Sequence, residues 1–122
     1  MVNYTRAYSG FSVRDIEKAR EFYSDVLGFG VEKNEMGILQ IDLGGGGHVI
    51  AYPKEDHVPA TFTILNLEVE DVEDAVDALV AKGVVMERYE GSPHDEKGIV
   101  RGWGPDIAWF KDPSGNIISV LH

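Results

Sequence analysis

Residues 15–23 (DIEKAREFY) decide the fold, because the chain repeats their pattern at residues 71–79 (DVEDAVDAL). A glycine closes each copy, Gly28 after the first and Gly83 after the second. The starts of the copies are 56 residues apart and the glycines 55 apart (71 − 15 and 83 − 28). Such a repeat within 122 residues indicates two similar modules. Two half-sheets that face each other form a cleft, which is where a ligand can bind.

Each copy predicts an amphipathic helix. Asp15 and Asp71 are good N-cap residues, and Gly28 and Gly83 are expected to end the helices. Apolar residues recur at helical spacing in both copies: Ile16, Ala19, Phe22, Tyr23, Val26 and Leu27, then Val72, Ala75, Val76, Leu79 and Val80.

Around the helices, β-prone stretches alternate with turn residues. The predicted strands are residues 4–13, 29–35, 37–43, 48–52, 60–69, 84–90, 107–110 and 117–121. Gly44–Gly47 lacks a P-loop's Gly-Lys-Ser/Thr ending and a following helix, so it is a hairpin turn rather than a phosphate loop. Asp112-Pro113-Ser114-Gly115 is a second strong turn.

The pattern is βαβββ written twice, which is an α+β fold. We expect one domain over residues 1–122, with modules at about 4–53 and 60–122 and a linker at 54–59. The modules are expected to form a curved mixed sheet with helices on its outer face and a concave cleft within.

Composition limits the partners. The net charge of −10 repels polyanions, so a nucleic-acid partner is not expected. No apolar run is long enough for a membrane span, and the N-terminus lacks the apolar core of a signal peptide. The absence of cysteine excludes disulfides and thiolate metal sites and fits a cytoplasmic protein.

Two motifs resemble a known family. Residues 13–29 (VRDIEKAREFYSDVLGF) and residues 110–116 (FKDPSGN) are similar to the vicinal-oxygen-chelate superfamily, which includes glyoxalase I, extradiol dioxygenases and bleomycin-resistance proteins. The similarity covers nearly the whole chain. It implies paired βαβββ modules, a cupped sheet and a homodimer.

The resemblance also implies where a divalent metal would bind. Metal-dependent members use His, Glu or Gln on inner strands of both modules. By spacing from the motifs, three of these positions fall on Tyr8, Ile64 and Ser119, and the fourth lies in the 48–52 strand in an unplaced register. An alkyl group and an alcohol are poor ligands for such ions, and tyrosine binds well only as phenolate. We therefore expect no metal and no other cofactor. His48 alone is not a site, and it also suits a half-solvated hairpin end; His57 and His122 are expected to be solvated.

Several residues could line a ligand pocket. Tyr8, Phe62, Ile64, Trp109 and Ser119 can reach the concave face, or can fill the cup as core, and Tyr52 shares a side of its strand with His48.

The 91–105 loop is too long for a simple turn, which is typical of functional loops. Trp103 can stack on a planar ligand, or cover the chain's own core or a dimer mate. Arg101 can pair with a ligand carboxylate, or with Asp95 or Glu96 on the surface. His94 and Asp95 are adjacent, which does not favour a hydrolytic dyad.

The sequence predicts a small-molecule binder that works without a metal and sequesters an aromatic or cationic compound, as bleomycin-resistance proteins do. One alternative is a glyoxalase-type lyase or dioxygenase with atypical metal ligands. A second is a non-catalytic interaction module, in which apolar side chains plug the cleft.

Overall fold

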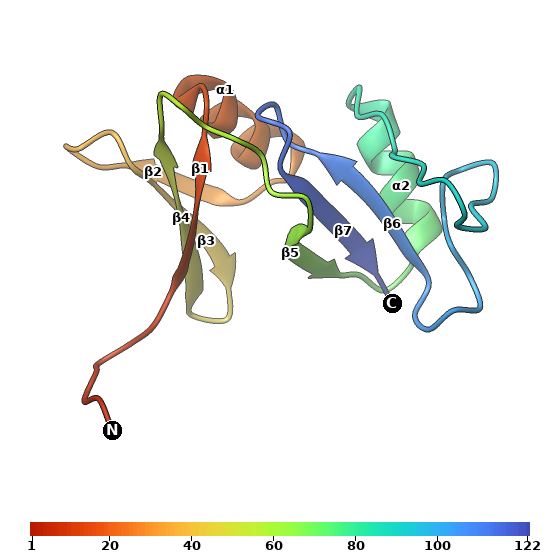
Figure 1. Cartoon of the computed structure of the whole chain (residues 1–122), viewed down its shortest axis with the longest axis horizontal. Helices are drawn as coiled ribbons and strands as arrows, with labels where there is room; N and C mark the ends of the chain where they lie inside the picture. Colours follow the sequence, from red (N-terminus) through yellow and green to blue (C-terminus); the bar gives the residue numbers. More distant parts are fainter. The chain divides into compact units, whose positions relative to one another are not determined.

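The computed structural model describes every residue from Met1 to His122. The chain divides into two compact units, Met1–Val58 and Pro59–His122. Each unit combines one mixed sheet with one helical segment (Figure 1). None of the helices has the length and apolar character that crossing a membrane requires.

The first unit contains a four-stranded sheet in the order β1-β4-β3-β2. Strand β1 (Ser9–Val13) runs parallel to β4 (Gly47–Pro53), and the other neighbours are antiparallel. Strands β2 (Gly30–Lys33) and β3 (Leu39–Gly44) form the hairpin at the outer edge. The predicted strand over residues 4–13 is thus shorter than expected, because only residues 9–13 pair with β4.

The first helical segment begins at its predicted cap. The carboxylate of Asp15 accepts hydrogen bonds from the backbone N–H groups of Glu17 and Lys18 at the start of α1 (Ile16–Glu21). The chain continues as a π-helical turn, η1 (Phe22–Val26), which the sequence pattern did not predict. Its wider turn has a bond from the Leu27 N–H to the Phe22 carbonyl, five residues back, at 3.1 Å. The segment ends as predicted at Gly28, which has a φ of 77°.

The core of the first unit lies between this helical segment and one face of the sheet. Tyr23 is fully buried there, 5.7 Å from Phe11 between ring centroids. The residues of β3 and β4 that face the helix are buried, namely Leu39, Ile41, Val49 and Ala51. Alternation leaves the other face of the sheet open for function.

The second unit has a three-stranded sheet in the order β5-β7-β6. Strand β5 (Thr63–Glu68) is parallel to β7 (Ile117–Leu121), which is antiparallel to β6 (Ile107–Lys111). Helix α2 (Val72–Ala81) begins at Asp71, whose side chain accepts the Asp74 N–H. It packs on β6 and β7, and the buried side chains between them are Val72, Val76, Leu79, Ala108, Phe110, Ile118 and Val120.

The prediction of a strand over residues 84–90 is wrong. Within this segment, a backbone hydrogen bond to β6 forms at Glu87, whose N–H donates to the Trp109 carbonyl at 2.8 Å. Beyond it, the Tyr89 N–H donates to the His94 ring instead of to a strand, and the Arg88 guanidinium donates to the carbonyls of Asp95 and Glu96. The second module is therefore βαβββ-like, with an irregular segment in place of one strand.

One turn geometry occurs three times. Asn34, Asp95 and Asp112 each donate their backbone N–H to the carbonyl four residues on, and each accepts, through its own carbonyl, the N–H three residues on. One side-chain oxygen of each also accepts the N–H groups two and four residues on, at 2.9 to 3.0 Å. The fourth position needs a left-handed backbone, which glycine supplies at 37, 98 and 115, with φ values of 79°, 88° and 84°.

His57 corrects an expectation from the sequence. It is buried rather than solvated, with 5% of its surface exposed. Its Nδ1 lies 2.6 Å from the hydroxyl of Ser12, and its carbonyl accepts a bond from Arg14. The end of the first unit is thereby fixed to β1.

Candidate functional site

The open face of the first sheet carries a small pocket. The pairing of β4 places His48 opposite Asp42, and Ile50 opposite Gln40 and Gly10. Because Val49 and Ala51 face the helix, alternation turns His48 and Ile50 to the open face, together with Tyr52. This register could not be assigned from the sequence.

Two rings form one wall of this pocket, which we call the Tyr8 pocket. The ring of Tyr8 lies against that of His48, with centroids 4.6 Å apart and planes inclined by 31°. The guanidinium of Arg6 lies 5.8 Å from the Tyr8 ring centroid. The cavity has a volume of about 240 Å³, and its lining includes Tyr8, Glu32, Ile38, Gln40, His48 and Ile50. Tyr52 is not part of the lining.

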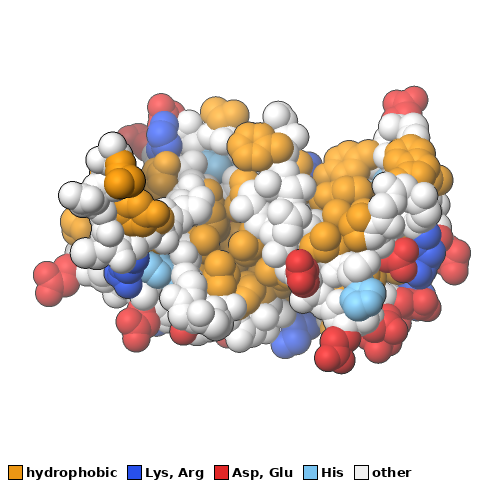
Figure 2. All heavy atoms as spheres, turned by 90° about the horizontal axis from the view of Figure 1, so that it is seen from below, with side chains coloured by type: hydrophobic (Ala, Val, Ile, Leu, Met, Phe, Trp, Pro, Cys, Tyr) orange, Lys and Arg blue, Asp and Glu red, His pale blue; other side chains and the backbone are white.

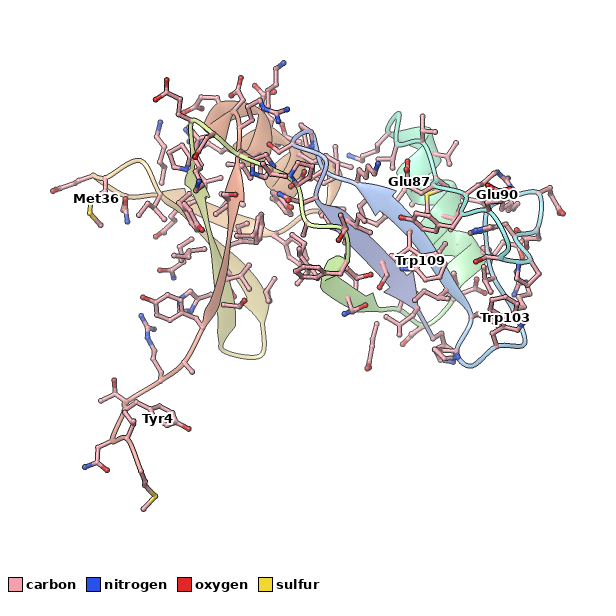
Figure 3. The ribbon with its side chains drawn as sticks, in the orientation of Figure 1. Tyr4, Met36, Glu87, Glu90, Trp103 and Trp109 are labelled. Atoms are coloured by element: carbon pink, nitrogen blue, oxygen red, sulfur yellow. The ribbon has the colours of Figure 1, made fainter.

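The second unit carries three aromatic side chains in contact, Tyr89, His94 and Trp109, which we call the aromatic cluster. The rings of Tyr89 and Trp109 meet edge to face at 5.5 Å, and His94 lies 6.1 Å from each of the other two. Trp109 alternates with the buried Ala108 and Phe110, so it is on the face of the sheet opposite α2 (Figure 3). A half-buried indole with aromatic neighbours can bind a flat molecule by stacking.

Backbone contacts fix the orientation of His94. Its Nδ1 donates to the Gly98 carbonyl at 2.7 Å, because its Nε2 accepts the Tyr89 N–H at 2.9 Å. The carboxylate of Asp95 accepts the N–H groups of Lys97 and Ile99 and does not reach the imidazole. The two residues therefore form no hydrolytic dyad, and His94 supports Tyr89 and Trp109.

Two polar residues, Ser119 and Asn66, lie next to Trp109 in the sheet. Ser119, in the central strand β7, lies opposite Trp109 of β6 on one side and Asn66 of β5 on the other. Its hydroxyl is buried and donates to the Asn66 side-chain oxygen at 2.6 Å. Ile64 lies two residues before Asn66 in β5, where the pairing with β7 shifts register between Thr63 and Leu65.

The 91–105 loop is attached to α2 by ion pairs. Arg101 lies 3.0 Å from Asp106 and 3.5 Å from both Asp95 and Glu73, so its expected pair with Asp95 forms. Lys97 bridges Glu73 and Asp77 at 2.9 Å. Hydrogen bonds from Lys97 to Asp77 and Glu73 raise the pKa of this lysine.

Two predicted aromatic residues lie outside both sites. Trp103 has 69% of its surface exposed and lies on the loop away from Trp109 (Figure 3), so it does not cover this chain's core. Phe62, just before β5, is 68% exposed.

Acid is expected to loosen the turn at Asp95. Burial raises the pKa of this carboxyl, but hydrogen bonds from Ile99 and Lys97 and the charge of Arg101 outweigh it and hold the pKa below the ordinary 3.8. A lowered pKa gives stability that is present above the unfolded value and is lost as pH falls through the folded one. Amide exchange at Lys97 and Ile99, corrected for intrinsic rates, should therefore accelerate below about pH 4. In Asp95→Asn this acceleration should be absent; an equal acceleration in that variant would contradict the assignment.

The donor set does not fit a divalent metal. No group of three or more His, Asp or Glu side chains is arranged to hold an ion. Of the positions at which the family's ligands would lie, Ile64 has no donor atom and the Ser119 hydroxyl is bonded to Asn66. The residues at these positions therefore do not favour binding of a divalent ion.

Sequence reasoning missed Tyr89, Asn66 and Gln40. The sequence pattern predicts a strand at Tyr89, but the contact of this residue with Trp109 depends on the irregular path of residues 84–90. The Glu87 N–H bond to Trp109 sets that path, and no local pattern reveals it. Alternation from Ile64 could have indicated Asn66 as a neighbour on the same face.

Comparison with known proteins identifies the class. The model of the Glyoxalase/Bleomycin resistance protein/Dioxygenase superfamily matches residues 5–120, so the chain belongs to this family. No curated protein matches the sequence. The α+β fold of two βαβββ-like modules with mixed sheets is that of this family, as predicted.

Among solved structures, TnmS3 from Streptomyces sp. CB03234, described as an antibiotic binding protein, is 25% identical. The match covers 96% of this chain and 95% of TnmS3, with a TM-score of 0.66. UcmS2 is 19% identical with a TM-score of 0.73, and 98% of each chain is covered. A protein described as the hypothetical SA1046 from S. aureus is 23% identical, with a TM-score of 0.70 and 96% of each chain covered. The last two likenesses concern the fold alone.

Proposed function

We propose that this protein binds planar aromatic small molecules without a metal ion and leaves them chemically unchanged. The observation that supports this most is the aromatic cluster, a half-buried tryptophan with two ring neighbours on the face of the sheet that α2 leaves open. Stacking on Trp109 would supply affinity, and the Asn66 amide, held by the buried Ser119 hydroxyl, would supply a polar contact. The description of TnmS3 as an antibiotic binding protein is consistent with this role.

The Tyr8 pocket is a second surface for the same class of ligand. Tyr8 and His48 offer ring faces, while Glu32 and Gln40 offer hydrogen-bonding groups around an apolar base. Ligand contacts by Tyr52, Phe62, Ile64, Arg101 and Trp103 stay predictions, as does a homodimer.

The net charge of the second unit indicates which ligand charges are favoured. Residues 59–122 contain 12 Asp and Glu against 5 Lys and Arg, a net charge of −7. Acidic side chains gather at the end of this unit that holds α2 and the 91–105 loop (Figure 2). Such a field attracts cationic aromatics and repels anionic ones, and it has little effect on neutral ones.

A panel of flat tricyclic compounds tests the function. Proflavine, a cation, and a neutral aminoanthraquinone should each quench the tryptophan fluorescence saturably, and an anthraquinone sulfonate should bind at least tenfold more weakly. Mass spectrometry of the recovered compounds should show them unchanged. Conversion of any bound compound would indicate an enzyme, and no binding across the panel would remove the proposal.

A further inference from the structure

A separate groove lies beside α2 in the second unit, on the helix side of the sheet. The last turns of the helix form one wall, through Val76 and Val80. The irregular chain after the helix forms the other, through Val84, Val85 and Met86. The volume is about 620 Å³, within the range of pockets that hold drug-sized ligands. Trp109 is on the opposite face, so this groove is distinct from the aromatic cluster.

The missing strand explains why the groove exists. Since residues 84–90 do not join the sheet as a strand, Val85 does not gain a neighbour there and remains 77% exposed. Val80 on the helix is 53% exposed. The Gly98 backbone lies close to Met86, since a Cβ added at Gly98 would be only 3.2 Å from the Met86 Cβ. Contiguous exposed apolar surface of this kind typically marks a binding site.

The charged groups around the groove disfavour an anionic occupant. The Arg88 guanidinium donates to the carbonyls of Asp95 and Glu96 at 2.7 and 2.6 Å. The ammonium of Lys97 is shared between Glu73 and Asp77. These cations are already bonded within the chain, so an anionic ligand would lose its hydration without gaining a free partner.

The lining also indicates an aliphatic occupant. Its apolar members are valine, alanine and methionine, and it contains no aromatic ring on which a flat molecule could stack. We infer that the groove beside α2 is a second binding site, which takes a neutral aliphatic molecule. This inference does not rest on the proposed function, because the two sites share no residue.

Titration calorimetry with 1-decanol tests the inference, since this probe is neutral and aliphatic. Decanol should bind the wild-type protein saturably, and decanoate at least tenfold more weakly. Val80→Asp and Val85→Asp each place a charge in the groove at an exposed position, and each should weaken decanol binding at least tenfold. Ala78→Asp, on the same helix but outside the lining, should leave it unchanged, as should Trp109→Leu.

Other results would overturn the inference. The groove is not a binding site for aliphatic molecules if decanol fails to bind, or if the Val80→Asp and Val85→Asp variants bind decanol as tightly as the wild type does. A dimer in sedimentation that Val80→Asp dissociates, without decanol binding, would mean that a second copy covers the groove. Loss of proflavine binding with decanol binding intact would affect only the proposed function.

Discussion

Replacing Asp112 with alanine is expected to lower the free energy of unfolding by about 3 kcal/mol, since it leaves buried donors without partners. One oxygen of this buried carboxylate accepts the N–H groups of Ser114 and Asn116, and the other accepts the Asn116 amide at 3.0 Å. Water cannot replace these bonds in the buried turn. Urea denaturation followed by circular dichroism measures the loss.

The repeated turn supplies matched controls. Asn34 makes the same backbone contacts in an exposed turn, where water can take over after Asn34→Ala, so we expect a cost of about 1 kcal/mol. Asp95→Ala should fall between the two, because its turn is part-buried. Equal losses at the three positions would contradict the role given to burial.

Replacing Trp109 with leucine is expected to weaken the binding of proflavine by about 30-fold, or about 2 kcal/mol, as is typical of a central tryptophan in a binding site. The leucine retains apolar bulk but loses the ring that meets Tyr89 and His94. Trp109→Phe keeps a ring and should cost only a few-fold. Calorimetry measures all three proteins under the same conditions.

Trp103→Leu is the matched control for this result. Trp103 is the other tryptophan of the chain, it is largely exposed, and it lies apart from Trp109 (Figure 3). We expect a change of less than threefold in the dissociation constant. A larger loss in this variant than in Trp109→Leu would place the ligand on the 91–105 loop instead.

Local signals predicted most of the fold. Asp15 and Asp71 cap their helices as expected because an aspartate at that position satisfies N–H groups of its own first turn. Gly28 ends its helix because it adopts a positive φ. Predictions of this kind succeed because each depends on a few neighbouring residues.

Features that depend on distant contacts could not be predicted. Residues 84–90 have the composition of a strand, yet the Tyr89 N–H bonds to the His94 ring instead of to a neighbouring strand, and the Arg88 guanidinium bonds to the carbonyls of Asp95 and Glu96. The burial of His57 depends on Ser12, 45 residues away. Trp109 was identified from its strand, but its partners Tyr89 and His94 come from a loop whose path no periodicity describes.

We propose that the aromatic cluster binds its ligand without a metal. The most direct test is calorimetry of proflavine with protein dialysed against EDTA, compared with the same protein after addition of Zn²⁺, Mn²⁺ or Fe²⁺. We predict saturable binding with the same isotherm in every case. Binding that appears only after a divalent ion is added would contradict the account.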